Sequence, residues 1–198
     1  MAQDTQITTT LLLERLHDSR NEWAWQTFDR RFRGVIVATG LRLGLSAPDA
    51  EEVAQETIFQ ALRDYQRGEY DRTRGRLSSW IVSIAHHRII DMRRKQRRNA
   101  SHGDPIDEPV EDDVALAFER SLEKQIFEQA WARLRSESQL AENTLLAFEL
   151  SVLRGVSPRE AAERCDLSVD QVYVARNRVT KQLRAAVEAI ERVVRDGL

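Results

Sequence analysis

Apolar residues recur every three or four positions along most of this chain, and that spacing constrains its fold more than any other feature. Recurrence at this spacing places apolar side chains on one face of an α-helix, whereas a strand needs strict alternation. Only eight glycines and four prolines occur in 198 residues. An all-β chain needs turn residues far more often than that. The sequence therefore predicts an all-α protein.

The composition excludes several classes of protein. Hydrophobic residues make up 41% of the chain, which is enough for a packed core. A single cysteine, Cys165, excludes an intrachain disulfide framework and a Cys-rich zinc site, and indicates a reducing compartment. No apolar run approaches the roughly 20 residues of a membrane span, and no signal-peptide pattern opens the sequence. We expect a cytoplasmic protein with no membrane insertion.

The formal net charge of −2 conceals an uneven distribution. Residues 1–100 carry 17 basic and 13 acidic side chains, residues 101–130 carry 2 and 9, and residues 131–198 carry 11 and 10. The acidic block begins in a segment with two prolines and a glycine, a composition typical of a linker. We therefore expect two small helical domains, residues 1–99 and 121–198, joined by an acidic flexible linker over residues 100–120.

Two helix starts lie close together near the carboxyl end. Ser157 to Glu160 and Ser168 to Gln171 both have the capping-box pattern, the first with proline at the first helical position. A short turn at Asp166 separates them, and aspartate tolerates the left-handed conformation better than most residues. The pattern predicts a helix-turn-helix that binds duplex DNA. The alternative is a packed α-hairpin with a solvated outer face.

Two further segments have a composition suited to nucleic acid. Residues 88–98 place six basic side chains at the end of an amphipathic helix, which favours contact with a polyanion over a solvated charge run. The polar stretch 66–75 lacks helical periodicity and combines arginines with Tyr70, as a loop that holds an unstacked base would. For that loop alone, an ordinary surface loop is the simpler interpretation.

The sequence also contains an acidic helix face, and it lacks catalytic motifs. Carboxylates at Asp49, Glu52 and Glu56 share one helix face, which is either solvated or a docking surface for a basic partner. His86 and His87 are adjacent, so they point to different faces and cannot ligate one metal there. No phosphate loop or nucleophile elbow occurs. We expect no enzyme and no catalytic, cofactor or metal site.

Taken in order, these segments resemble the extracytoplasmic-function (ECF) sigma factors of bacterial RNA polymerase. Asp49 to Glu56 resembles the polymerase-docking helix of that family, and Tyr70 to Ile81 resembles the segment before its basic helix. Ile84 to Asp91 and the following Arg93-Arg94-Lys95 resemble its promoter-melting helix. Leu153 to Arg184 resembles its carboxy-terminal helix-turn-helix.

The resemblance implies a promoter-specificity subunit whose partners are core RNA polymerase and promoter DNA. Control would act in trans, through an anti-sigma protein or at the level of synthesis. The polymerase-binding residues would be Asp49, Glu51, Glu52, Gln55 and Glu56. The residues for melted minus-ten DNA would be Tyr70, Arg72, Arg74, Arg76, His87, Arg88, Arg93, Arg94 and Lys95. Those for the minus-thirty-five duplex would be Ser168, Asp170, Gln171, Tyr173, Arg176, Asn177, Arg178 and Lys181.

The sequence departs from the family pattern at several positions. His87 replaces a usual asparagine, Asp166 replaces a turn glycine, and Val174 with Ala175 replaces a common Ser-Arg pair. The departure at His87 concerns minus-ten specificity, and the departure at Val174 and Ala175 concerns the minus-thirty-five contacts, while the acidic docking face is intact. Two alternatives remain, a stand-alone helix-turn-helix regulator and a helical adaptor without DNA binding. Neither needs both the acidic face at 49–56 and the basic region at 88–98.

Overall fold

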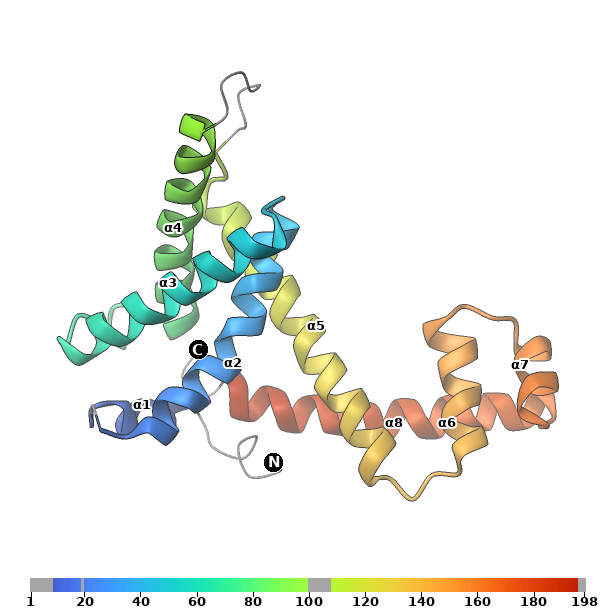
Figure 1. Ribbon diagram of the computed structural model, residues 1–198. Helices are drawn as coiled ribbons and strands as arrows, with labels where there is room; N and C mark the ends of the chain where they lie inside the picture. Colours follow the sequence, from blue (N-terminus) through green and yellow to red (C-terminus); the bar gives the residue numbers. More distant parts are fainter. Residues whose placement is uncertain (1–8, 19, 100–107, 196–198) are drawn as a thin grey trace. The chain divides into compact units, whose positions relative to one another are not determined.

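The computed structural model describes residues 9–18, 20–99 and 108–195, and within them all regular structure is helical, which confirms the all-α prediction (Figure 1). None of the helices in this part is long and apolar enough to cross a membrane. The helices are α1 (Thr9–Leu16), α2 (Glu22–Arg42), α3 (Ala47–Gln66), α4 (Leu77–Asn99), α5 (Glu111–Glu137), α6 (Glu142–Phe148), the short π-helical η2 (Glu149–Leu153), α7 (Pro158–Cys165) and α8 (Val169–Arg195).

The chain divides into two compact units. The first unit comprises residues 1–125 and 192–198, and the second comprises residues 126–191. Helices α5 and α8 each contribute residues to both units. The boundary between the units thus lies inside α5, and the last turn of α8 returns to the first unit.

In the first unit, α3 packs against both α2 and α4 (Figure 1). Asn21 and Ser46 cap α2 and α3, because each side chain accepts a hydrogen bond from a backbone N–H three residues on. Apolar residues at helical spacing then face a common core. Its most deeply buried large side chains include Phe32, Ile36, Val53, Leu77, Ile81, Ile89, Phe118 and Leu122.

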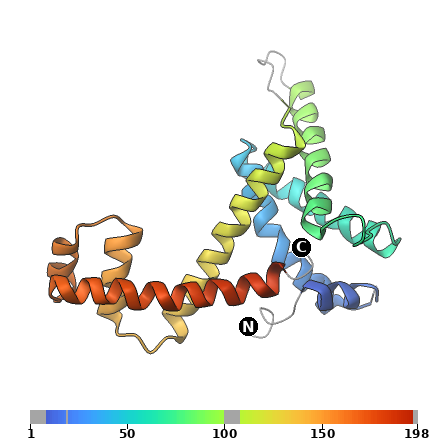
Figure 2. The same ribbon diagram turned by 180° about the vertical axis from the view of Figure 1, so that it is seen from behind.

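Polar contacts join the remaining helices of the first unit to α2. Buried Thr9 of α1 accepts a hydrogen bond from Arg31 of α2 at 3.0 Å and donates one to the carbonyl of Val194 at 2.7 Å. The amino-terminal half of α5 lies beside α2 (Figure 2), where the Gln125 amide donates to the Arg31 carbonyl. A Cβ atom at Gly34 would lie 2.8 Å from the Gln125 amide oxygen, so a side chain there would require the Gln125 side chain to move.

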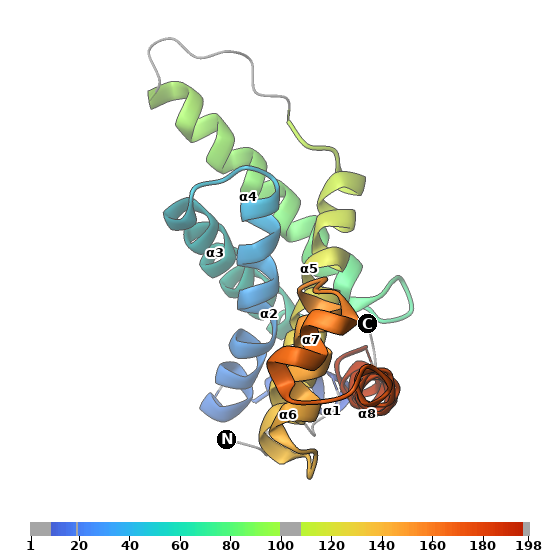
Figure 3. The same ribbon diagram turned by 90° about the vertical axis from the view of Figure 1, so that its right-hand side faces the viewer.

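The second unit has a small core of its own, to which α6, η2, α7 and α8 all contribute. Figure 3 looks nearly along α8, with α6 and α7 beside it. Ser168 and Gln171 cap α8 reciprocally through hydrogen bonds of 3.2 and 2.7 Å, which confirms the predicted capping box there. At α7 the Ser157 hydroxyl accepts from the Glu160 N–H at 3.2 Å, while the Glu160 carboxylate binds Arg164. The buried residues are Ala147, Leu150, Ala161, Ala162, Cys165, Val172 and Ala175.

One sequence expectation differs from the structure. Residues 111–120, expected in the flexible linker, are helical, because three carboxylates in the first turn of α5 favour a helix amino terminus. Residues 100–107 of the expected linker lie outside the described part.

Candidate functional site

The acidic face is the exposed side of α3 formed by Asp49, Glu51, Glu52, Gln55 and Glu56. Ser46 starts this helix, and its hydroxyl accepts a hydrogen bond from the Asp49 N–H at 3.3 Å. Val53, Ala54 and Ile58 lie on the opposite side and are buried. Burial of that side against α2 and α4 fixes the orientation of the helix, so the carboxylates of the acidic face turn outward.

The structure places the basic helix α4 directly beside the acidic face. The Lys95 ammonium lies 2.8 Å from a Glu52 carboxylate oxygen, and the Gln96 amide donates to Asp49 at 2.9 Å. The hydrogen bond from Lys95 to Glu52 raises the pKa of that ammonium above its ordinary value. The two oppositely charged surfaces therefore contact each other in the free chain, a relation that the sequence did not reveal.

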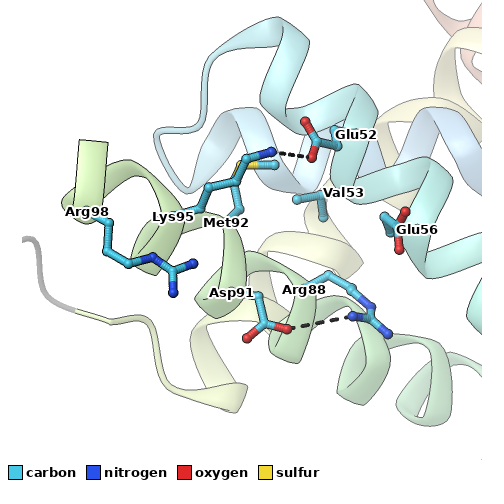
Figure 4. A pocket seen from close by; sticks show the side chains of 8 residues that line it. All are labelled: Glu52, Val53, Glu56, Arg88, Asp91, Met92, Lys95 and Arg98. Carbon is cyan, nitrogen blue, oxygen red and sulfur yellow. Dashed lines mark hydrogen bonds and ion pairs between the residues drawn. The ribbon is translucent and has the colours of Figure 1, made fainter. Parts of the chain in front are cut away.

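A cavity of about 240 Å³ opens between α3 and α4 where these charges meet (Figure 4). Arg88 lies at one end of it, donates to the Gln60 amide oxygen at 3.3 Å and lies 3.7 Å from Asp91. The Nε of Arg88 is buried without a hydrogen-bond partner. The lining residues are Glu52, Val53, Glu56, Arg88, Asp91, Met92, Lys95 and Arg98.

The basic end of α4, defined as Arg93, Arg94, Lys95, Arg97 and Arg98, has carboxylates around it. Arg94 and Arg97 both contact Glu108, which lowers the pKa of that carboxyl below its ordinary value. Arg93 differs from the others because it is only 9% exposed and donates to the carbonyl of Leu43 beyond the end of α2. Arg93 therefore joins α4 to α2, and we leave it out of the candidate DNA surface.

The loop over residues 67–76 begins at a left-handed glycine. Gly68 has a φ of +75°, and hydrogen bonds from Gly68 and Glu69 to the carbonyls of Tyr65 and Asp64 end α3 in a Schellman motif. Glycine suits this position because the left-handed region penalises a Cβ atom. This motif turns the chain sharply, so Arg72, Arg74 and Arg76 lie exposed beyond it.

Aromatic rings hold this loop against the first unit. The Tyr70 ring packs against Trp80 of α4 with centroids 5.1 Å apart, and the Tyr65 ring centroid lies 6.2 Å from that of Tyr70. Partial burial raises the pKa of the Tyr70 hydroxyl. Arg72 donates to the Thr10 hydroxyl of α1 at 3.2 Å. Tyr70 is thus half-buried, while the arginines of the loop are the groups available to a ligand.

The two adjacent histidines of α4 both contact backbone carbonyls. Nε2 of His86 lies 2.9 Å from the Pro109 oxygen, and Nδ1 of His87 lies 2.7 Å from the Ser83 oxygen. Only His87 is exposed, on the side of α4 that solvent reaches. Within the described ranges no group of three His, Cys, Asp or Glu residues could hold a metal ion.

The outer face of α8 is set by the residues buried on its inner side. Val172 and Ala175 face the small core and Val179 is also buried, so the helical period turns another set of residues outward. Ala175, the second residue in place of the family's common Ser-Arg pair, is therefore a core residue and does not lie on the outer face. The outward set is Asp170, Tyr173, Val174, Asn177, Arg178 and Lys181.

Four of the residues expected at duplex DNA already contact one another at α8: Ser168 with Gln171, and Tyr173 with Arg176. Gln171 accepts from the Ser168 N–H through its side-chain oxygen, so its amide group belongs to the helix cap. The Arg176 guanidinium lies over the Tyr173 ring, 5.6 Å from its centroid, and is half-buried. Asn177, Arg178 and Lys181 are exposed. The cationic side of this face consequently centres on Arg178 and Lys181.

Comparison with known proteins agrees with this geometry. Residues 28–99, which include the acidic face, the loop and α4, match the family described as Sigma-70 region 2. The chain is also 29% identical over 127 residues to the ECF RNA polymerase sigma factor RpoE of Cereibacter sphaeroides, an alignment that covers 62% of this chain and 67% of that protein. Together with the all-helical fold, these matches support a sigma factor of the ECF type in the sigma-70 family.

Proposed function

We propose that this sigma factor directs core RNA polymerase to specific promoters through three surfaces. Sigma factors are transcription initiation factors and not enzymes, and the family implies core polymerase and promoter DNA as partners. In this proposal the acidic face docks on the polymerase. The loop and α4 bind melted minus-ten DNA, and the outer face of α8 recognises the minus-thirty-five duplex. Residues 1–99 would carry the first two roles and residues 121–198 the third.

The observation that carries the proposal is the pairing of opposite charges in the first unit. A duplex-binding regulator needs only a basic surface, whereas this unit holds an acidic helix and a basic helix rigidly side by side. Two partners of opposite charge can therefore bind one rigid body simultaneously. A basic segment of the polymerase suits the acidic face, and a DNA strand suits α4.

The melted strand would bind through exposed cations of the loop and of α4. Capturing an unstacked base costs a few kcal/mol, which stacking and phosphate contacts can offset. Tyr70 and Trp80 supply packed rings at the base of the loop. The cations that we assign to this strand are Arg72, Arg74, Arg76, Arg88, Arg94 and Lys95, with His87 beside them.

Run-off transcription with purified core polymerase and genomic DNA tests the proposal. We expect transcripts from defined start sites that appear only when the chain is added, and upstream of them a shared pair of sequence elements. The alternative of a stand-alone regulator predicts sequence-specific duplex binding without polymerase and no new transcripts. A cytoplasmic location and control by an anti-sigma protein belong to the same proposal. Cell fractionation checks the location, and co-purification from cells checks for the anti-sigma protein.

A further inference from the structure

An apolar patch lies on the outer face of α8, among residues that would meet DNA. Val169, Tyr173 and Val174 are 40%, 50% and 64% exposed. Val174 is the most exposed of the large hydrophobic side chains in the described part of the chain. It points away from the core because its neighbours Val172 and Ala175 are buried.

The chemistry of Val174 is unfavourable for a purely solvated position. A β-branched side chain loses rotamer freedom in a helix. An exposed apolar side chain also lacks the favourable free energy that burial away from water would give. Burial elsewhere in the second unit does not explain this valine, since its side chain lies on the side opposite to the core. A partner that covers the patch would account for an apolar residue here.

The charges around the patch indicate which partner covers it. Asn177, Arg178 and Lys181 follow Val174 along the same exposed side of the helix. Cations beside an apolar contact suit the major groove of duplex DNA, where phosphates line the edge and each thymine presents a C5-methyl group. A hydrophobic protein partner would not need this set of cations.

We propose that Val174 contacts the C5-methyl group of a thymine in the upstream promoter element and thereby determines specificity at that base pair. This inference rests on the proposed function of α8 and adds to it a particular residue and a particular chemical group. Cytosine lacks that methyl group and adenine presents polar atoms in its place, so a small apolar side chain favours thymine. Asn177 lies one turn further along and remains free to contact an adjacent base.

The test uses holoenzyme and synthetic duplexes. A duplex of about 30 base pairs is first selected by holoenzyme from a pool randomised upstream of a fixed minus-ten element. Each thymine of the selected upstream element is then replaced in turn by deoxyuridine, which lacks only the methyl group. Burial of one methyl group predicts that one such replacement weakens binding by about fourfold.

The variants decide whether Val174 is the contact. In Val174→Ala the ratio of the affinities for the thymine and deoxyuridine duplexes at that position should fall to about one. Val174→Ile should retain the ratio of the wild type. Val152→Ala removes another exposed valine, 41% exposed and located on η2, and should leave the ratio of the two affinities unchanged. The amount of core polymerase that co-purifies should be the same for the wild type and the three variants.

Three results would overturn the inference. They are an equal thymine preference in wild type and Val174→Ala, no upstream thymine whose methyl group matters, and weaker polymerase binding by Val174→Ala with unchanged DNA binding. The last result would assign the patch to a protein surface. Failure of the proposed function is distinguishable, since it would appear as no selected upstream element and no loss of duplex binding in Arg178→Ala.

Discussion

The cations of α4 and those of α8 differ in what surrounds them in the free chain. On α4, Lys95 contacts Glu52, while Arg94 and Arg97 share Glu108. On α8, Arg178 and Lys181 are exposed and make no ion pair with any other described residue. Phosphates that reach α4 must displace carboxylates, whereas those that reach α8 do not. For the same number of cations, we therefore expect α4 to bind DNA more weakly than α8 in the free chain.

The largest effect is expected on the acidic side of the α3–α4 pair. Reversing Asp49, Glu52 and Glu56 to arginine should weaken binding to core polymerase by far more than tenfold, because like charges placed opposite each other cost several kcal/mol. The fold should persist, since these carboxylates are not part of the core. Co-purification with core polymerase and far-ultraviolet circular dichroism measure the two outcomes.

A matched reversal provides the control for that experiment. Glu142, Glu163 and Glu188 are exposed carboxylates of the second unit, and changing them to arginine adds the same charge. We expect this variant to retain polymerase binding. Equal losses in the two triple variants would show that total charge, and not the acidic face, governs the association.

The second effect concerns the unpaired cations of α8. Replacing both Arg178 and Lys181 by alanine should weaken duplex binding and reduce the slope of log affinity against log salt by about 1.8, if each contacts one phosphate. Affinity measured at several salt concentrations gives the slope. Arg133→Ala, which removes a cation already paired with Glu137, is the control and should leave the slope unchanged.

A third, smaller effect compares how the two units end a helix. Gly68 closes α3 and Asp166 closes α7, both with positive φ, and Asp166 has φ 53° and ψ 50°. Asp166→Ala should lower the free energy of unfolding by about 1 kcal/mol, because alanine lacks a polar side chain to support the left-handed conformation. Asp166→Gly should have a free energy of unfolding equal to or higher than that of the wild type. Thermal unfolding would contradict this reasoning if alanine proved the more stable.

The smallest effect tests the carboxylate that covers α4. Glu108→Gln should strengthen binding of the free chain to single-stranded DNA by about two- to fivefold at low salt, because exposed ion pairs are weak. Salt near 1 M should abolish the gain, since screening then acts within about 3 Å. Glu111→Gln, a nearby exposed change, serves as the control. Fluorescence anisotropy of a labelled strand provides the measurement.

The pH dependence of the same contact has a defined sign. Arg94 and Arg97 lower the pKa of Glu108 in the folded chain relative to its unfolded value. The contact therefore stabilises the fold fully above the unfolded pKa, and this contribution disappears as the pH falls through the lowered folded pKa. A nuclear magnetic resonance titration of the Glu108 carboxyl should show the lowered pKa, and Arg94→Ala should return it toward its ordinary value.

Local features of the fold were predictable from the sequence because they depend on near neighbours. The caps at Asn21, Ser46, Ser157 and Ser168 follow from side chains that bond to backbone groups within three residues. The left-handed Asp166 follows from the turn between two capped helices. The helical start of α5 was missed because its acidic run was attributed to a linker, although carboxylates also favour a helix amino terminus.

The candidate site was predictable as segments and not as a surface. The spacing of Asp49, Glu52 and Glu56 indicated one acidic face, and the basic run indicated one basic helix end. Arg93 could not be separated from its neighbours in that run, because its burial depends on the position of the Leu43 carbonyl. For the same reason the burial of Ala175 needed the core of the second unit.

The sequence by itself determined the helical class, the helix caps and the types of charge that each segment presents. Periodicity and capping act over three or four residues, so they require no knowledge of distant parts. Only the tertiary structure decided which charges meet. Glu52 and Lys95 lie 43 positions apart and come together because α3 and α4 bury their apolar sides against a shared core. Packing between helices, and not any local pattern, sets which cations of this sigma factor are already paired and which remain open to DNA.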